Sequence, residues 1–143
     1  MNIENYGVIV FLFSVLFSVN PHPEKFTDRL TTGIINSPAG NRNNVWVYFT
    51  DKGFKSPAEI NLAFNDLKSG FPAKTLSRRS KTHKANLIDH RDLEVSDKYI
   101  QKITDCGVKL RVTSKWLNAV SIETANDQLD CISELDFVTK LDL

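Results

Sequence analysis

The chain has 143 residues, with 18 Lys and Arg against 17 Asp and Glu, and its formal net charge is +1. This balance excludes the strong one-signed field that would indicate a nucleic-acid or membrane-lipid partner. The length fits one domain with a leader. The three histidines lie in polar segments away from both cysteines, so the sequence predicts no metal site and no cofactor.

The first notable segment is an apolar run of twelve residues over 8–19, VIVFLFSVLFSV. A membrane-spanning helix needs about 20 such residues, whereas a secretory leader needs fewer. The residues before the run contain no Lys or Arg, and no A-x-A cleavage site follows it. We predict a signal peptide over 1–20, and hence a secreted protein, extracellular or periplasmic, that meets a membrane only through its leader. A short anchor or a buried helix is the alternative.

Residues 21–44 are rich in Pro, Asn, Thr and Gly, which predicts a loose linker. Residues 45–50, VWVYFT, are all β-branched or aromatic and predict a strand. Because apolar and polar residues do not alternate in this run, we expect the strand to be buried on both faces, as in a central strand or one covered by a partner.

A helical insertion over 53–92 is expected next. Ser56 and Glu59 form a capping box around Pro57, and an apolar stripe follows at helical spacing over residues 60–67. The stretch 74–84 then holds five Lys or Arg and no acid. It predicts a solvated loop or helix face. A dibasic processing site at Arg78-Arg79 and a docking site for an acidic partner are the alternatives.

The last fifty residues predict a helix, two strands, a short helix and a strand. Ser96 is the expected cap of the first helix and Gly107 its C-terminal stop, and Asn126 is the expected cap of the second helix. The strands are expected over 108–115, 116–123 and 137–143. In the second of them, Val120 and Ile122 share one face, and Ala119 and Ser121 share the other.

The predicted order is strand, helix, strand, strand, helix, strand, once the insertion is set aside. This order is typical of the ferredoxin-like α+β fold, βαββαβ, in which two helices lie on one face of a four-stranded antiparallel sheet. The predicted organisation is therefore a signal peptide over 1–20, a linker over 21–44 and a ferredoxin-like domain over 45–143.

Two cysteines, Cys106 and Cys131, both fall in predicted helices. In an exported chain the two cysteines could form a disulfide. The more frequent fate of a lone helical cysteine is a buried apolar contact, which is what we expect for both.

Several segments taken in order resemble the N-terminal prodomain of secreted bacterial subtilisin-like proteases, the subtilase family. They are VWVYFTDKG, LSRRSK, the pair Tyr99-Ile100, GVKLRVTSKWLNAVSIET and LDFVTKLDL. The resemblance covers about residues 45–143, and its most specific piece is SKWLNAVSIE.

The resemblance implies a propeptide that acts as an intramolecular chaperone and temporary inhibitor of a catalytic domain C-terminal to it on the same chain. It implies that the sheet packs on the protease and that the C-terminal tail enters the active-site cleft. The candidate protease-binding residues are Asn118, Ala119, Ser121, Leu141, Asp142 and Leu143. The last three form the end of an edge strand, so we expect them to make few core contacts and to contribute little to the fold.

Three other classes of function can be weighed against this one. A self-contained enzyme is disfavoured because the chain lacks G-x-S-x-G and the subtilase Asp, His and Ser motifs, so no catalytic residue is predicted. An RNA-recognition module is disfavoured because an RNP pattern is missing and residues 92–143 carry ten acids against six Lys or Arg. A free-standing protease inhibitor of the same fold is the remaining alternative.

Overall fold

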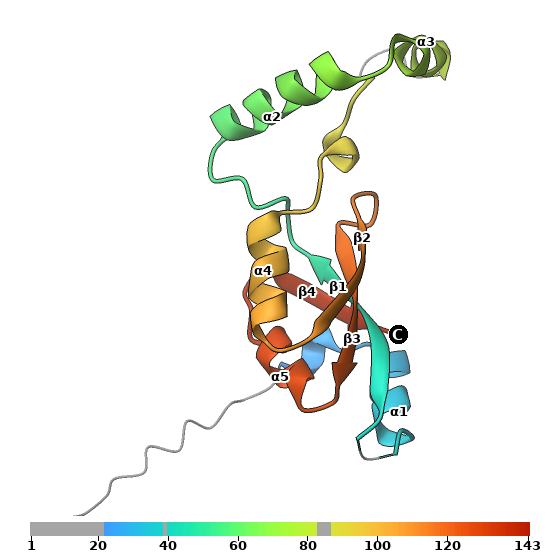
Figure 1. Ribbon diagram of the computed structural model, residues 1–143, viewed down its shortest axis with the longest axis vertical. Helices are drawn as coiled ribbons and strands as arrows, with labels where there is room; N and C mark the ends of the chain where they lie inside the picture. The colour runs from blue at the N-terminus through green and yellow to red at the C-terminus, as the bar shows by residue number, and fades with distance from the viewer. Residues whose placement is uncertain (1–21, 39, 83–86) are drawn as a thin grey trace, which may run out of the picture.

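We describe the protein from a computed structural model, which covers residues 22–38, 40–82 and 87–143; the predicted signal peptide lies outside these ranges. The described strands are β1 (Arg42–Phe49), β2 (Lys109–Ser114), β3 (Ala119–Ala125) and β4 (Val138–Asp142). They form an antiparallel sheet in the order β2-β3-β1-β4. The helices α4 (Asp97–Asp105) and α5 (Gln128–Ser133) lie together on one face of this sheet (Figure 1). The predicted ferredoxin-like α+β fold is confirmed.

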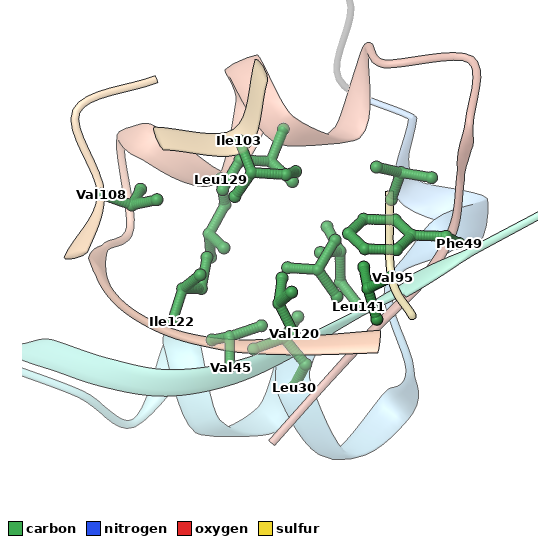
Figure 2. Packing of buried hydrophobic residues seen from close by; sticks show 13 residues of the cluster. Leu30, Val45, Phe49, Val95, Ile103, Val108, Val120, Ile122, Leu129 and Leu141 are labelled. Carbon is green, nitrogen blue, oxygen red and sulfur yellow. The ribbon is translucent and has the colours of Figure 1, made fainter. Parts of the chain in front are cut away.

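Most of the core lies between the sheet and these two helices, and Leu30, from the segment before β1, also belongs to it (Figure 2). Val45, Val47 and Phe49 of β1 are buried, while the residues between them are partly exposed. Within this chain, therefore, only one face of this central strand is buried, and burial of the other face by a partner stays a prediction. Trp46 and Tyr48 occupy the alternate positions and point away from the core, as the two-residue period of a strand requires.

The helix α4 begins after Ser96 and ends just before Gly107, as predicted, although the side chain of Ser96 makes no capping hydrogen bond. Gly107 has φ +81°, a left-handed conformation that glycine adopts without steric penalty, and it stops the helix. Ile103 from this helix is fully buried in the core.

A disulfide joins Cys106 to Cys131, with the two Cα atoms 6.0 Å apart. The expectation of two separate buried thiols was therefore wrong. Cys106 caps the C-terminus of α4 and Cys131 lies within α5, so the bond ties together the two helices that cover the sheet.

The chain between β2 and β3 is a turn over residues 115–118, where we had expected a second strand to begin at residue 116. Asn118 closes this turn with φ 50°, a conformation that asparagine tolerates better than most residues. Trp116 and Leu117 therefore lie in the hairpin turn. Val120 and Ile122 remain in the core and are fully buried, as predicted.

The start of α5 also differs from the prediction. Asp127 is the N-cap residue, and no side-chain cap hydrogen bond is formed at this end. The side chain of Asn126, the predicted cap, instead accepts a hydrogen bond at its Oδ1 from Asn43 Nδ2, at 3.0 Å. Asn126 is thereby used to connect the helix to β1.

The predicted loose linker contains ordered structure. A 3₁₀ turn, η1 (Pro23–Lys25), is followed by the helix α1 (Asp28–Ile35), whose N-cap Thr27 accepts a hydrogen bond from Leu30 N–H. Leu30 is fully buried in the core cluster. The helix lies beside β4 and the C-terminus, at the side of the sheet away from α4 (Figure 1). The prediction of a loose segment here was therefore wrong.

The insertion between β1 and α4 consists of α2 (Pro57–Gly70), α3 (Ala73–Thr82) and the 3₁₀ turn η2 (His90–Asp92), and it projects away from the sheet (Figure 1). Ser56 caps α2 by accepting a hydrogen bond from Glu59 N–H, which confirms one half of the predicted capping box. The Glu59 carboxylate accepts from Lys55 N–H and not from Ser56 N–H, so the other half differs from the prediction. No described residue of α2 or α3 is fully buried. The expected apolar stripe is only half-buried, so the insertion depends on contacts within itself.

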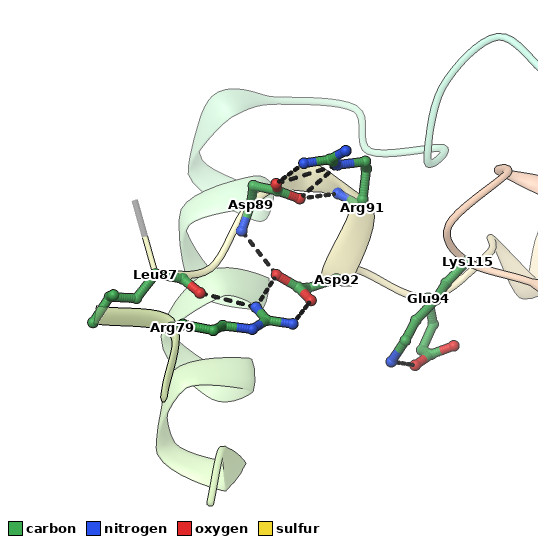
Figure 3. A network of polar contacts seen from close by, with 7 residues as sticks. All are labelled: Arg79, Leu87, Asp89, Arg91, Asp92, Glu94 and Lys115. Atoms are coloured by element: carbon green, nitrogen blue, oxygen red, sulfur yellow. Dashed lines mark hydrogen bonds and ion pairs between the residues drawn. The ribbon is translucent and has the colours of Figure 1, made fainter. Parts of the chain in front are cut away.

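The main such contact is an ion pair between Arg79 and Asp92, with two Nη–Oδ distances of 2.8 Å (Figure 3). Arg79 also donates to Leu87 O at 2.9 Å, and its guanidinium lies 4.9 Å from the Phe71 ring centroid. Most of the predicted basic stretch thus lies in α3. One of its arginines, Arg79, binds other residues of the insertion.

We expect the insertion to loosen at low pH. The hydrogen bonds from Arg79 hold the pKa of Asp92 below its ordinary value of 3.8. A carboxyl whose pKa is lowered in the folded state stabilises that state above the unfolded pKa, and this contribution is lost as pH falls through the folded pKa. The protection factors of α3 amides, in which the intrinsic slowing of exchange in acid is divided out, should therefore fall on acidification below about pH 4. Asp92→Asn should show fast exchange at neutral pH already, and an unchanged exchange rate in this variant would contradict the assignment.

Candidate docking face

The face of the sheet opposite α4 and α5, which we call the outer face, is defined by the strand register. Trp46 pairs with Ser121, and Tyr48 pairs with Ala119. On the other side of β3, Val112 and Ser114 of β2 pair with Ser121 and Ala119 respectively. On the other side of β1, Lys140 and Asp142 of β4 pair with Tyr48 and Trp46. Paired residues share a face, so these eight side chains make one surface.

This surface is mixed in character. Two aromatic rings of β1 stand beside the small side chains of β3, and Lys140 Nζ lies 4.0 Å from the Tyr48 ring centroid. Aromatic side chains flanked by small ones are common in protein–protein interfaces, because the rings supply contact area at low entropic cost. The sequence-based site included Ala119 and Ser121 but missed Trp46 and Tyr48, although strand alternation would have placed them here.

The hairpin between β2 and β3 adds exposed apolar area. Val112, Trp116 and Leu117 are 55%, 55% and 51% exposed. Large apolar side chains that are exposed together often mark a protein contact. These three residues were also missed, because a strand was expected where the turn lies.

Five of the six candidate residues fall into two groups, and Asn118 stands apart. Ala119 and Ser121 lie on the outer face, with 0% and 8% exposure. Leu141, Asp142 and Leu143 lie at the end of β4, on the other side of β1 from β3. Leu141 pairs with Val47 and is fully buried, so it is a core residue. The expectation that the last three residues contribute little to the fold is therefore wrong for Leu141.

The side chain of Asn118 makes hydrogen bonds within the domain. Its Nδ2 donates to Phe49 O at 3.1 Å and to Asp51 O at 2.7 Å, which ties the hairpin turn to the end of β1. Beside it, the buried ammonium of Lys52 donates to Leu93 O at 2.7 Å and Lys115 O at 2.8 Å. Burial lowers the pKa of Lys52. These hydrogen bonds fix the β2–β3 hairpin relative to the residues that flank the insertion, Lys52 and Leu93.

The geometry defines a ferredoxin-like domain with a partly apolar outer face and a C-terminal strand at the sheet edge. A family model described as the peptidase S8 propeptide domain of Bacteroidota matches residues 44–143. The match covers more than half of the chain, so the protein belongs to this family of subtilisin-like protease propeptides. No curated protein and no solved structure gave a significant match.

Within the described ranges, no helix is both long enough and apolar enough to cross a membrane.

Proposed function

We propose that this chain is the propeptide region of a secreted subtilisin-like serine endopeptidase, and that it acts as intramolecular chaperone and temporary inhibitor. Its partner is a catalytic domain C-terminal to it on the same polypeptide. The observation that carries the proposal is the family match over 44–143, which coincides with a complete ferredoxin-like sheet.

In this proposal the outer face docks on the catalytic domain, and the chain beyond β4 enters the active-site cleft. Trp46, Tyr48 and Val112 supply the contact area, while the small and already buried Ala119 and Ser121 pair with Tyr48 and Trp46 and keep this part of the face low. A partner that binds the native catalytic domain but not its unfolded chain stabilises the native form. Bringing distant segments together also lowers the entropic barrier to their pairing. Docking of the outer face, with entry of the chain into the cleft, therefore accounts for both the chaperone role and the inhibitory role.

The docking face predicts a selective effect of Val112→Asp. Val112 is 55% exposed, so the change should cost the fold less than about 1 kcal/mol. A carboxylate in a desolvated contact is unfavourable, so the inhibition constant should rise tenfold or more, which is roughly 1.4 kcal/mol. Leu62→Asp, at a 64% exposed position of α2, is the matched control and should inhibit as wild type does. If Val112→Asp inhibited with the same inhibition constant as wild type, the outer face would not be part of the interface.

The chaperone role is tested by refolding. Catalytic domain denatured in guanidinium is diluted with and without the folded chain, the chain is then digested away, and the recovered enzyme is counted by active-site titration. The proposal predicts a several-fold higher yield when the chain is present. Equal yields would exclude the chaperone role. Sequencing the reading frame beyond Leu143 separates a zymogen from the free-standing inhibitor.

A further inference from the structure

The segment that precedes the family domain contacts residues 141–143. Residues 22–35, which we call the N-terminal clamp, precede the family match over 44–143. Phe26 forms a parallel bridge with Leu141, and Thr27 N–H donates to Leu141 O at 3.0 Å. The clamp therefore occupies part of the edge of β4 that faces away from β1. An uncovered edge would leave these backbone groups without protein partners.

Side chains extend this contact to the last two residues. Thr27 Oγ1 donates to Asp142 Oδ1 at 2.8 Å, and the same carboxylate oxygen accepts from Leu143 N–H at 3.0 Å. The hydrogen bond from Thr27 is the main reason that the pKa of Asp142 is lowered. Gly33 of α1 lies against the Leu143 side chain, so closely that a Cβ at this position would collide with it.

The same part of the clamp is also attached to α5. Lys25 Nζ donates to Ser133 O at 2.7 Å and to Leu135 O at 3.0 Å, at the C-terminal end of α5. Further along the clamp, Leu30 is fully buried, between the contacts that Thr27 and Gly33 make with residues 141–143. The segment is thus anchored to the rigid part of the domain on one side and holds β4 on the other.

We propose that the N-terminal clamp is a positioning element that sets the direction in which the chain leaves β4. The proposal rests on the proposed function, in which that departing chain enters the protease cleft. An extended tail that is already held in one direction loses less conformational entropy on binding. The inhibitory unit would then be residues 22–143, and not the family domain alone.

Gly33→Ala tests this proposal in the full chain. The added methyl group should displace the flexible Leu143 side chain, while alanine in place of glycine favours the helix α1. We expect an unchanged or higher thermal midpoint together with an inhibition constant raised fivefold or more. A substitution that acted only through stability would not weaken inhibition. Thr31→Ala is the matched control, since Thr31 is an exposed residue of the same helix and its replacement also favours helix; it should inhibit as wild type does.

The assay uses the catalytic domain of the parent precursor and a chromogenic peptide substrate. Wild-type potency in Gly33→Ala would overturn the clamp proposal and leave the proposed function standing. Equal weakening by Gly33→Ala and Thr31→Ala would overturn it too, because the Leu143 contact would then not be the cause. Absence of inhibition by the wild-type chain would overturn the inhibitory function itself, and the clamp proposal with it.

Discussion

Val120→Asp is expected to leave the domain unfolded. Val120 is fully buried and pairs with Val47 in the centre of the sheet. The core cluster to which it belongs is made of hydrophobic side chains, which cannot pair with a carboxylate. An uncompensated buried charge costs roughly 3–5 kcal/mol, and small domains have only about 5–15 kcal/mol in total. Circular dichroism and urea titration should show the loss of the cooperative unfolding transition, or its shift to much lower urea.

The control for this variant is Val112→Asp, which places the same side chain on the adjacent strand at an exposed position. It should keep the wild-type spectrum and nearly the wild-type urea midpoint. If Val120→Asp unfolded at the same urea concentration as Val112→Asp, the register that puts Val120 in the core would be contradicted.

Removal of the disulfide is the second large effect. The bond closes a loop between residues separated by 25 positions, Cys106 and Cys131. In the chain-entropy account, a loop of this length raises the free energy of unfolding by about 3 kcal/mol. The double variant Cys106→Ala, Cys131→Ala should lose about that amount, measured by urea denaturation.

The reduced wild-type chain supplies the comparison. A reducing agent should lower its urea midpoint toward that of the double variant, and should leave the double variant itself unaffected. If the urea midpoint of the wild-type chain did not change under conditions that fully reduce the disulfide, the bond would not stabilise the fold.

Much of the fold follows from local sequence patterns. The β-branched run around Val45 gives β1, the cap at Ser56 starts α2, and Gly107 stops α4. Each of these signals is local, because it depends on side-chain shape or on a hydrogen bond within one turn. Taken in order, they were sufficient for the ferredoxin-like arrangement.

The helix α1 was missed because its sequence is a poor helix former. It contains two threonines, a glycine and two isoleucines within eight residues, DRLTTGII. What holds it is tertiary: the cap at Thr27, the burial of Leu30 and the contact with Leu143. Local propensity carries no information about such contacts.

The disulfide and the role of Leu141 were missed for a related reason. Whether two cysteines pair depends on the distance between their Cα atoms, here 6.0 Å, and a sequence separation does not reveal it. Leu141 was treated as the end of an edge strand. Its side chain shares the core face with Val47, and the clamp covers the edge of β4 beside it, so Leu141 is fully buried.

The candidate site was only partly predictable. Alternation in β3 correctly separated Val120 and Ile122 from Ala119 and Ser121. The exposed Trp116 and Leu117 were assigned to a strand, because the left-handed conformation of Asn118 that makes the turn was not recognised.

The central claim is that the folded chain inhibits a subtilisin-like catalytic domain. The most direct measurement is a titration of that domain with the wild-type chain, with peptide hydrolysis followed at each concentration. We predict that hydrolysis falls to near zero at a one-to-one ratio and recovers only as the chain is degraded. Full hydrolysis in the presence of an excess of folded chain would contradict the account.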